Sequence, residues 1–170
     1  SLRRKTATVG DIDLAVMTDK PIELMEYLLE FKGIKKVLST GSKTTMFIHQ
    51  SGRQVDVKTQ SKDRWGSMLQ HYTGSKLHNI HLRKLAIEKS MSLSEHGIKR
   101  GGKLYKYASE EDFYKALGLR YIPPELREDS GEIEASIKGK LPGLVELKDI
   151  KGDLHMHTNI EIETSHDMGV

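Results

Sequence analysis

Three aspartates in the first third of the chain are spaced so that their carboxylates could act together. Asp11 and Asp13 stand two residues apart in a run that alternates polar and apolar side chains, residues 11–17. Residues i and i+2 of a strand point to the same face of a sheet, so both carboxylates could reach one site. Asp56 lies in a second alternating run, residues 53–59. If the two predicted strands are neighbours, the three carboxylates converge.

Three converging carboxylates are the arrangement that holds two divalent cations for phosphoryl transfer. Such cations lie about 3.5–4 Å apart and clamp the attacking and leaving oxygens. Mg²⁺ suits the site because it takes few carboxylates and completes its shell with water and phosphate oxygens. The alternative is that Asp11 and Asp13 mark the turn entering a strand, with both side chains solvated. A third acid on its own strand and the upstream pair Arg3-Arg4 favour phosphoryl transfer.

The elements that must position these residues are a mixture of helices and strands. A helix is expected to start at Pro21, and a tight hairpin link at Ser51-Gly52. Ser109, followed by three acidic residues, is expected to cap a helix that ends at Leu117-Gly118. The spacing of apolar residues predicts further strands over 34–40, 44–50, 53–59 and 104–107, and helices over 62–70 and 75–89.

Composition narrows the classes of protein. The 170 residues include 36% hydrophobic and 30% charged residues, which is typical of a folded soluble protein. No apolar run approaches the roughly 20 residues that cross a bilayer, and the first residues lack the apolar segment of a signal peptide. The absence of cysteine excludes disulfides and thiolate metal sites. It fits a reducing cytoplasm, which is the predicted location.

The charge is unevenly distributed along the chain. Residues 71–107 hold eight Lys or Arg and two Glu, which gives +6, whereas residues 108–149 hold ten acidic and six basic residues, which gives −4. The basic stretch also contains His71, Tyr72, His78 and His81. It is interpreted as a face that contacts phosphates, and the alternative is a solvated helix surface.

Several motifs together resemble the DNA polymerase beta superfamily of nucleotidyltransferases. Ser1-Leu2-Arg3-Arg4 followed by Gly10-Asp11-Ile12-Asp13 resembles the signature G-S-x-R-R…G-D-x-D, and Asp56 matches the third catalytic aspartate. Residues 73–79, TGSKLHN, with Arg83 beyond them, are similar to the T-G-S…N…R segment of family X DNA polymerases. Residues 117–127 resemble the end of the polymerase core in bacterial and archaeal members. Residues 152–158, GDLHMHT, look like the opening of their PHP phosphoesterase domain.

The resemblance implies an α+β fold and a division of the chain. A polymerase beta-like palm, truncated at its start, is expected over residues 1–62, and a small α+β nucleotide-selecting subdomain, the thumb, over 63–129. A linker over 130–150 and an incomplete PHP domain over 151–170 follow. The chain is then expected to be part of a longer protein.

Site roles also follow from the resemblance. Asp11 and Asp13 would bind both Mg²⁺ (or Mn²⁺) ions, and Asp56 would bind the catalytic ion next to the primer 3′-hydroxyl. Arg83 would contact the DNA template strand. His155 and His157 would bind metal only in an intact PHP domain. The incoming dNTP would be contacted by Ser1, Arg4, Gly10, His71, Tyr72, Gly74 and Asn79.

The helix over 75–89 is expected to present Asn79 and Arg83 on one exposed face that looks toward the aspartates. Leu82 and Leu85 would then be buried, and the helix would hinge near Thr73-Gly74.

The function implied is template-directed transfer of a nucleotide from a dNTP to a primer 3′-hydroxyl, by a two-metal DNA polymerase that fills gaps in DNA repair. DNA and dNTP are the expected partners, and no oligomeric state is implied. The isolated chain is expected to be a weak polymerase or an inactive one. Two alternatives remain: a nucleotidyltransferase that acts on a non-DNA substrate, and a non-catalytic DNA-binding module.

Overall fold

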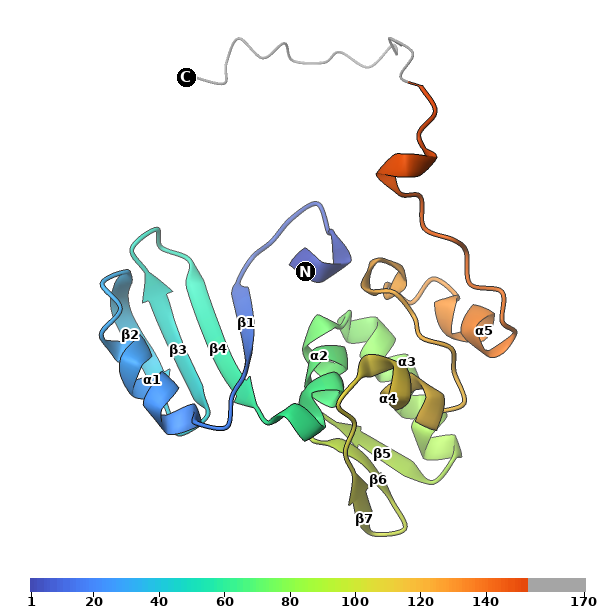
Figure 1. The fold of residues 1–170 in the computed structure, drawn as a ribbon, viewed down its shortest axis with the longest axis horizontal. Coiled ribbons are helices and arrows are strands. Elements are labelled where there is room, and N and C mark those ends of the chain that lie inside the picture. Colours follow the sequence, from blue (N-terminus) through green and yellow to red (C-terminus); the bar gives the residue numbers. More distant parts are fainter. Residues whose placement is uncertain (153–170) are drawn as a thin grey trace.

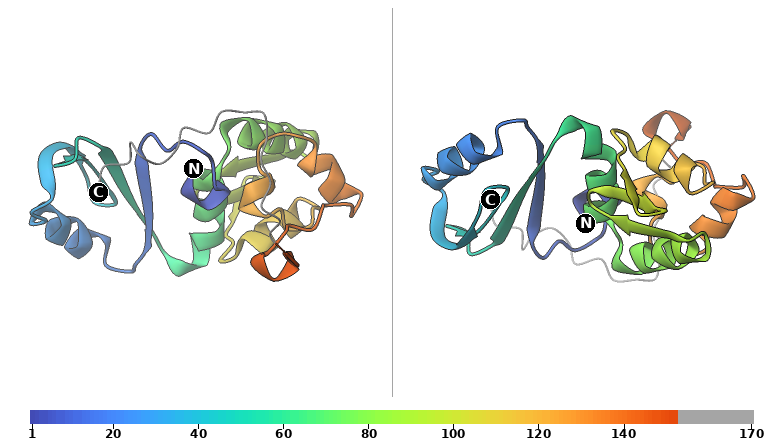
Figure 2. Two further views of the ribbon diagram at one scale, coloured as in Figure 1. Left: turned by 90° about the horizontal axis from the view of Figure 1, so that it is seen from above. Right: turned by 90° about the horizontal axis from the view of Figure 1, so that it is seen from below.

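The structure is a computed structural model that describes residues 1–152, and these contain two sheets with separate cores (Figure 1). Figures 1 and 2 show the first sheet at one end of an elongated molecule and the second sheet, with its helices, at the other. The mixture of helices with two mainly antiparallel sheets confirms the expected α+β class.

The first part is a four-stranded sheet in the order β1-β4-β3-β2. β1 and β4 are parallel, and the other two pairings are antiparallel. One face packs against a helix, because Met25 contacts the buried Phe47, Val55 and Val57. The elements of this part are η1 (Leu2–Arg4), β1 (Ile12–Met17), α1 (Pro21–Leu29), β2 (Ile34–Thr40), β3 (Thr44–His49) and β4 (Gln54–Gln60).

The second part surrounds the antiparallel sheet β5-β6-β7 with helices. Its core includes Leu82, Phe113, Leu117 and Ile122, none of which is exposed to solvent. The elements are η2 (Lys62–Arg64), α2 (Trp65–Thr73), α3 (Lys76–Glu88), β5 (Met91–Ser94), β6 (Gly97–Arg100), β7 (Lys103–Tyr105), α4 (Glu110–Ala116), η3 (Pro124–Leu126), α5 (Glu132–Ile137) and η4 (Leu147–Asp149).

Helix capping follows the sequence closely at two positions. The Ser75 side chain accepts a hydrogen bond from the backbone N–H of His78 at 3.2 Å and so caps α3. Ser109 accepts one from the N–H of Asp112 at 3.1 Å and caps α4, as expected. No helix within residues 1–152 has the length and apolar character needed to span a bilayer.

The C-terminal segment differs from the predicted linker. Residues 132–137 form α5, and Ile133, which is 1% exposed, belongs to the core of the second part. The helix is short and has only two large apolar residues, Ile133 and Ile137. Such a segment has too little periodicity to be recognised without its packing partner.

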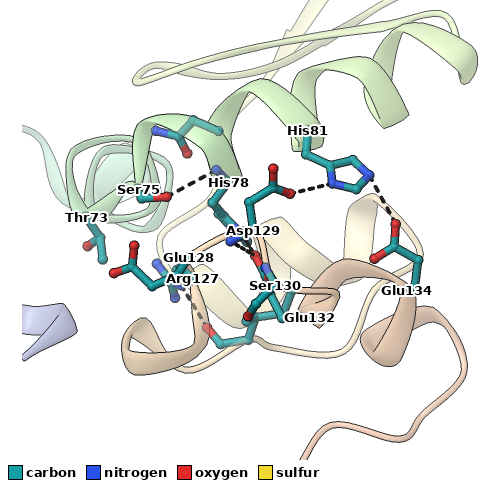
Figure 3. Close-up of polar contacts among 12 residues, drawn as sticks. Thr73, Ser75, His78, His81, Arg127, Glu128, Asp129, Ser130, Glu132 and Glu134 are labelled. Atoms are coloured by element: carbon teal, nitrogen blue, oxygen red, sulfur yellow. Dashed lines mark hydrogen bonds and ion pairs between the residues drawn. The ribbon is translucent and has the colours of Figure 1, made fainter. Parts of the chain in front are cut away.

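A buried polar cluster attaches this segment to α3 (Figure 3). The His78 Nδ1 lies 2.5 Å from Glu132 Oε1, and its Nε2 lies 2.9 Å from the Tyr114 hydroxyl. The Glu132 carboxylate also accepts hydrogen bonds from the backbone N–H groups of Asp129 and Ser130, at 3.1 and 2.8 Å. Burial lowers the pKa of His78, so its neutral ring donates to Glu132 and accepts from Tyr114.

The interpretation of the basic stretch as a phosphate-contacting face was therefore wrong for His78. His78 is fully buried in this cluster. His81 lies between two carboxylates, with Nδ1 2.8 Å from Asp129 Oδ1 and Nε2 3.3 Å from Glu134 Oε1 (Figure 3). Their partners follow them by about 50 residues, so the helix sequence alone did not reveal these roles.

We expect Glu132→Gln to destabilise the chain. The carboxylate is nearly inaccessible and satisfies three donors, so replacing it should lower the free energy of unfolding at pH 7 by about 1–3 kcal/mol. The matched control is Glu134→Gln on the same helix, where the half-exposed side chain should contribute less than about 1 kcal/mol.

The pH dependence of stability supplies a second readout. Burial lowers the pKa of His78. Burial alone would raise the pKa of Glu132, but the hydrogen bonds that its carboxylate accepts lower that pKa below its ordinary value. The His78 shift makes stability fall as the pH drops below about 6.5, where an unfolded His takes up protons, and the Glu132 shift adds to the fall below about 4.5, where an unfolded Glu does. Urea unfolding between pH 4 and 8 should show a steeper dependence in Glu132→Gln above about pH 5, because Glu132 opposes the lowering of the His78 pKa and the variant lacks that opposition. Equal stability and pH dependence in the two variants would contradict the role of this cluster.

Candidate active site

The parallel pairing of β1 with β4 brings two of the three aspartates together. Asp13 and Asp56 are register partners, and β4 buries Val55 and Val57 on the opposite face. Asp56 therefore points away from the α1 core, with a side chain that is 14% exposed, and accepts a hydrogen bond from Gln54 Nε2 at 2.9 Å. Asp13 is 54% exposed. The sequence correctly placed both on strands, and the structure makes those strands neighbours.

Asp11 lies just before β1 and is exposed. The strand begins at Ile12, one residue later than expected, so Asp11 is on the approach to the sheet rather than in its ladder. Within residues 1–152, no three His, Cys, Asp or Glu side chains are grouped closely enough to hold a metal ion. The expected convergence is thus present for Asp13 and Asp56, but is not complete with Asp11.

Lys58 supplies a cation to the aspartate pair. Its Nζ lies 3.1 Å from Asp13 Oδ1 and 3.5 Å from Asp56 Oδ2, and 4.6 Å from the centre of the Tyr72 ring. Burial alone would lower the pKa of Lys58, but the hydrogen bond and charge of Asp13, together with the charge of Asp56, raise it above its ordinary value. The two carboxylates therefore share a charged ammonium, which indicates a site suited to cations.

The carboxylates fit Mg²⁺ by their chemistry. They are hard oxygen donors, one of them well exposed, and together they already neutralise a cation. A divalent ion at this pair would compete with the Lys58 ammonium for the same oxygens.

A cleft of about 340 Å³ opens beside Asp13, between η1 and the junction of α2 with α3. Both hydroxyl and guanidinium groups face it, which suits a phosphorylated ligand. It gathers most of the residues predicted to contact the nucleotide or DNA, but not Gly10. The lining residues are Ser1, Arg4, Asp13, His71, Tyr72, Thr73, Gly74, Ser75, Lys76, Asn79 and Arg83.

Arg4, predicted to bind phosphate, is already held by protein groups. Its Nε donates to the Thr73 carbonyl at 2.9 Å, and its Nη1 forms an ion pair with Glu128. Only 13% of the Arg4 side chain is exposed, whereas Glu128 is 44% exposed. The sequence offered no signal for this pair, because Glu128 lies in a polar run that resembles a boundary and is separated from Arg4 by more than 120 residues.

The neighbouring Arg3 forms a second link from η1. Its Nη2 lies 2.7 Å from Glu110 Oε2, and its Nη1 donates to the Thr73 hydroxyl. Glu110 also binds the fully buried Arg127, whose Nη1 is 2.6 Å from Glu110 Oε1. Glu110 thus joins η1 to the second part of the molecule.

Helix α3 agrees only partly with its predicted orientation. Arg83 is exposed and lines the cleft, while Leu82 is buried and Leu85 packs partly against the core. Asn79, however, is half-buried, and both ends of its amide bind α2: Oδ1 accepts from Gln70 at 2.8 Å and Nδ2 donates to the His71 carbonyl at 2.7 Å. Its amide is therefore committed to joining two helices.

His71 and Tyr72 lie side by side at the cleft, with ring centres 4.8 Å apart. Burial lowers the pKa of His71, although Glu95, whose Oε2 is 4.0 Å from Nε2, opposes the shift. His71 is therefore neutral at pH 7. The other predicted metal ligands, His155 and His157, lie outside the described residues.

Comparison with known proteins identifies relatives of this chain. It matches the DNA polymerase beta thumb family over residues 68–128. It is 40% identical over 165 residues to DNA polymerase/3′-5′ exonuclease PolX of Bacillus subtilis, which covers 93% of this chain and 28% of that protein. DNA polymerase IV of Saccharomyces cerevisiae is 36% identical over 75 residues, covering 44% of this chain and 13% of that protein.

A human relative, DNA-directed DNA/RNA polymerase mu, is 36% identical over 77 residues, covering 44% of this chain and 16% of that protein. The chain therefore spans less than a third of the length of each of these relatives. On the thumb match and the extended bacterial match together, the chain belongs to family X of the DNA polymerases.

Proposed function

We propose that the chain carries the nucleotidyl-transfer site of a DNA-directed DNA polymerase, which extends a primer 3′-hydroxyl with a dNTP. The observation that carries this proposal is the register of Asp13 with Asp56 beside a cleft lined by Arg4 and Arg83. Paired carboxylates suit a divalent cation, and guanidinium groups suit phosphates. The relatives, which are named as DNA polymerases, support DNA as the substrate.

The proposed division follows the two sheets. Residues 1–62 act as the palm, which supplies the carboxylates. The nucleotide-selecting subdomain begins at residue 63 and extends through α5, because Ile133 is part of its core. The thumb match over residues 68–128 supports this division. The PHP domain expected from residue 151 onward, with His155 and His157, stays a prediction.

The reaction assigns a task to each side chain at the cleft. Asp11, Asp13 and Asp56 would hold Mg²⁺ or Mn²⁺, which stabilises negative charge on the transferring phosphate. Asp56 accepts the proton of the primer 3′-hydroxyl, whose oxygen forms a bond to the α-phosphorus of the dNTP while the bond from that phosphorus to pyrophosphate breaks. Arg4 and Ser1 bind the leaving pyrophosphate, and Arg83 positions the template strand.

Other roles in the cleft concern the nucleotide itself. Gly10 and Gly74 contribute backbone contacts, and His71 and Tyr72 lie against the sugar. Asn79 must either give up a hydrogen bond to α2 to reach the base or serve the site by holding α3 against α2. Gap filling in DNA repair is the biological setting that the family resemblance suggests.

The two alternative functions differ from the proposed one in whether a primer is extended and in whether nucleotide binding depends on metal. A nucleotidyltransferase acting on a non-DNA substrate would bind nucleotide with metal but would not extend a primer. A non-catalytic DNA-binding module would bind no nucleotide in a metal-dependent manner. Primer extension with a dNTP at low salt, alongside calorimetry, distinguishes all three.

We expect Asp13→Asn to weaken metal-dependent nucleotide binding. The substitution removes the exposed charge of the carboxylate pair and should weaken binding of dNTP in the presence of Mn²⁺ about tenfold or more, as loss of a charged hydrogen-bonding group of about 1.5–3 kcal/mol implies. Asp19→Asn, an exposed aspartate outside the cleft, is the control and should bind as the wild type does. Calorimetric titrations that show equal affinity for both variants would defeat the assignment.

We expect Glu128→Gln to tighten dNTP binding. The Glu128 carboxylate pairs with the Arg4 guanidinium, so a triphosphate must compete with it. This partly exposed ion pair contributes up to about 1 kcal/mol, so its removal should raise the affinity for dNTP by up to about fivefold.

Glu125→Gln is the matched control for this experiment. Glu125 lies three residues earlier in η3 and pairs at 3.1 Å with the exposed Lys5 instead, so its loss changes the net charge equally without freeing Arg4. A gain of affinity in both variants would attribute the effect to net charge, and no gain in either would argue against a phosphate role for Arg4.

A further inference from the structure

The β6–β7 hairpin concentrates positive charge outside the cleft. Residues 97–106 contain four basic residues and no acidic residue. Lys106 is paired with Asp63 at 2.8 Å. Within residues 1–152, Lys99, Arg100 and Lys103 form no ion pair, and all three are exposed.

Two of these cations face each other across the hairpin. Arg100 and Lys103 are register partners, and both lie over the ring of Tyr105, with Arg100 Cζ 5.3 Å and Lys103 Nζ 5.5 Å from its centre. Like charges directly opposite each other destabilise a strand pair, and a shared aromatic ring offsets this only in part. The hairpin thus carries a repulsion for which the fold of residues 1–152 provides no counter-charge.

The backbone holds this pair in a fixed position. The connecting residues Gly101 and Gly102 have φ values of 55° and 77°, which make a two-residue turn that L side chains disfavour. At Gly97, a Cβ would lie 2.0 Å from the Tyr105 carbonyl oxygen, so the two strands approach closely at the other end of the ladder. The cations are therefore presented by a constrained hairpin rather than by a loose loop.

A cavity of about 250 Å³ lies beside the cations. It is lined by Met91, Ile98, Arg100, Tyr105, Tyr107 and Ala116. Arg100 thus stands beside aromatic and apolar side chains, which suits a nucleic-acid strand, because its phosphates need cations and its sugars and bases need nonpolar contact.

We propose that the β6–β7 hairpin binds the sugar-phosphate backbone of DNA at a second position, separate from the Asp13–Asp56 cleft. Figure 1 shows the hairpin projecting from the side of the molecule opposite to η1 and the start of β1. The inference rests on the proposed function, because it takes DNA as the substrate. A second contact of this kind would hold DNA through its phosphates without reading its sequence.

The test compares two double variants of equal charge. Arg100→Gln/Lys103→Gln removes the hairpin pair, and Lys115→Gln/Lys138→Gln removes two exposed lysines from α4 and the end of α5. DNA binding is measured by fluorescence anisotropy at several salt concentrations, with a labelled duplex and with a single strand of the same length. Calorimetric titration with dNTP and Mn²⁺ measures nucleotide binding at the cleft in the same proteins.

The hairpin variant should lower the slope of log affinity against log salt by about 1.8 for duplex DNA, or about 1.4 for the single strand, since two phosphate contacts are lost. A loss of the full expected size with one form of DNA and little loss with the other identifies the form that the hairpin binds. The lysine control should keep the wild-type slope, and nucleotide binding should be unchanged in both. If the double variant is destabilised and melts at a lower temperature, the Lys103→Gln single variant is used instead, and it should lower the salt slope by half as much.

An unchanged slope in the hairpin variants would overturn the inference, and so would an equal loss in the lysine control. The outcome is separable from the proposed function. If the wild-type chain binds dNTP and Mn²⁺ but no DNA, the proposed hairpin contact is refuted while the proposed nucleotide site is retained. Loss of nucleotide binding in Asp13→Asn, with the salt slope for DNA retained, would support the two sites as distinct.

Discussion

The parallel pairing of β1 with β4 is the constraint on which the candidate site depends. These strands are separated by α1 and the β2–β3 hairpin, yet their register sets Asp13 opposite Asp56. A shift of one residue would turn Asp56 toward the α1 core and expose Val55 and Val57. Burial of these two valines therefore fixes the position of the carboxylate, so that packing on one face of the sheet determines chemistry on the other.

Charges at the cleft are compensated internally. Lys58 neutralises the aspartate pair, Glu128 neutralises Arg4, and Glu110 lies between Arg3 and Arg127. A ligand that brings both a cation and phosphates would replace these internal partners: the cation would take the place of Lys58 at the aspartates, and the phosphates would take the place of Glu128 at Arg4. Such exchange reduces affinity, because existing ion pairs must be broken, but it avoids the repulsion that unpaired charges would impose on the unliganded fold. The cations of strands β6 and β7 differ from those at the cleft, because they have no acidic partner within residues 1–152.

The sequence predicted the features that depend on local pattern. Alternation identified β1, β3 and β4 and hence the faces of Asp13 and Asp56, and serines correctly marked the starts of α3 and α4. It failed where a partner lies far along the chain. The strands β5 and β6 have four residues each and were not predicted, α5 needs the core around Ile133, and the roles of His78, Glu128 and Asn79 come from contacts that no local spacing encodes.

The same contacts bear on where the molecule could bend. A hinge at Thr73-Gly74 would separate α2 from α3, but Asn79 joins these helices through Gln70 and His71. In addition, α2 is packed on α4 so closely that a Cβ at Gly66 would lie 2.1 Å from the backbone of Ser109.

Helix α2 therefore belongs to the second part, and bending between α2 and α3 would break the hydrogen bonds of Asn79 to α2. η1 is also bound to this part, through Arg3, Arg4 and Lys5, whereas β1 belongs to the first sheet. Within residues 1–152, two chain segments then cross between the parts: residues 6–11, which are mostly exposed, and the turn at η2 that follows β4. A rotation of one part against the other would bend these two segments and would also break the contacts of Lys58 with Tyr72 and of Gln60 with His96. It would change the distance between the aspartates of the first sheet and Arg4 and Arg83 of the second part.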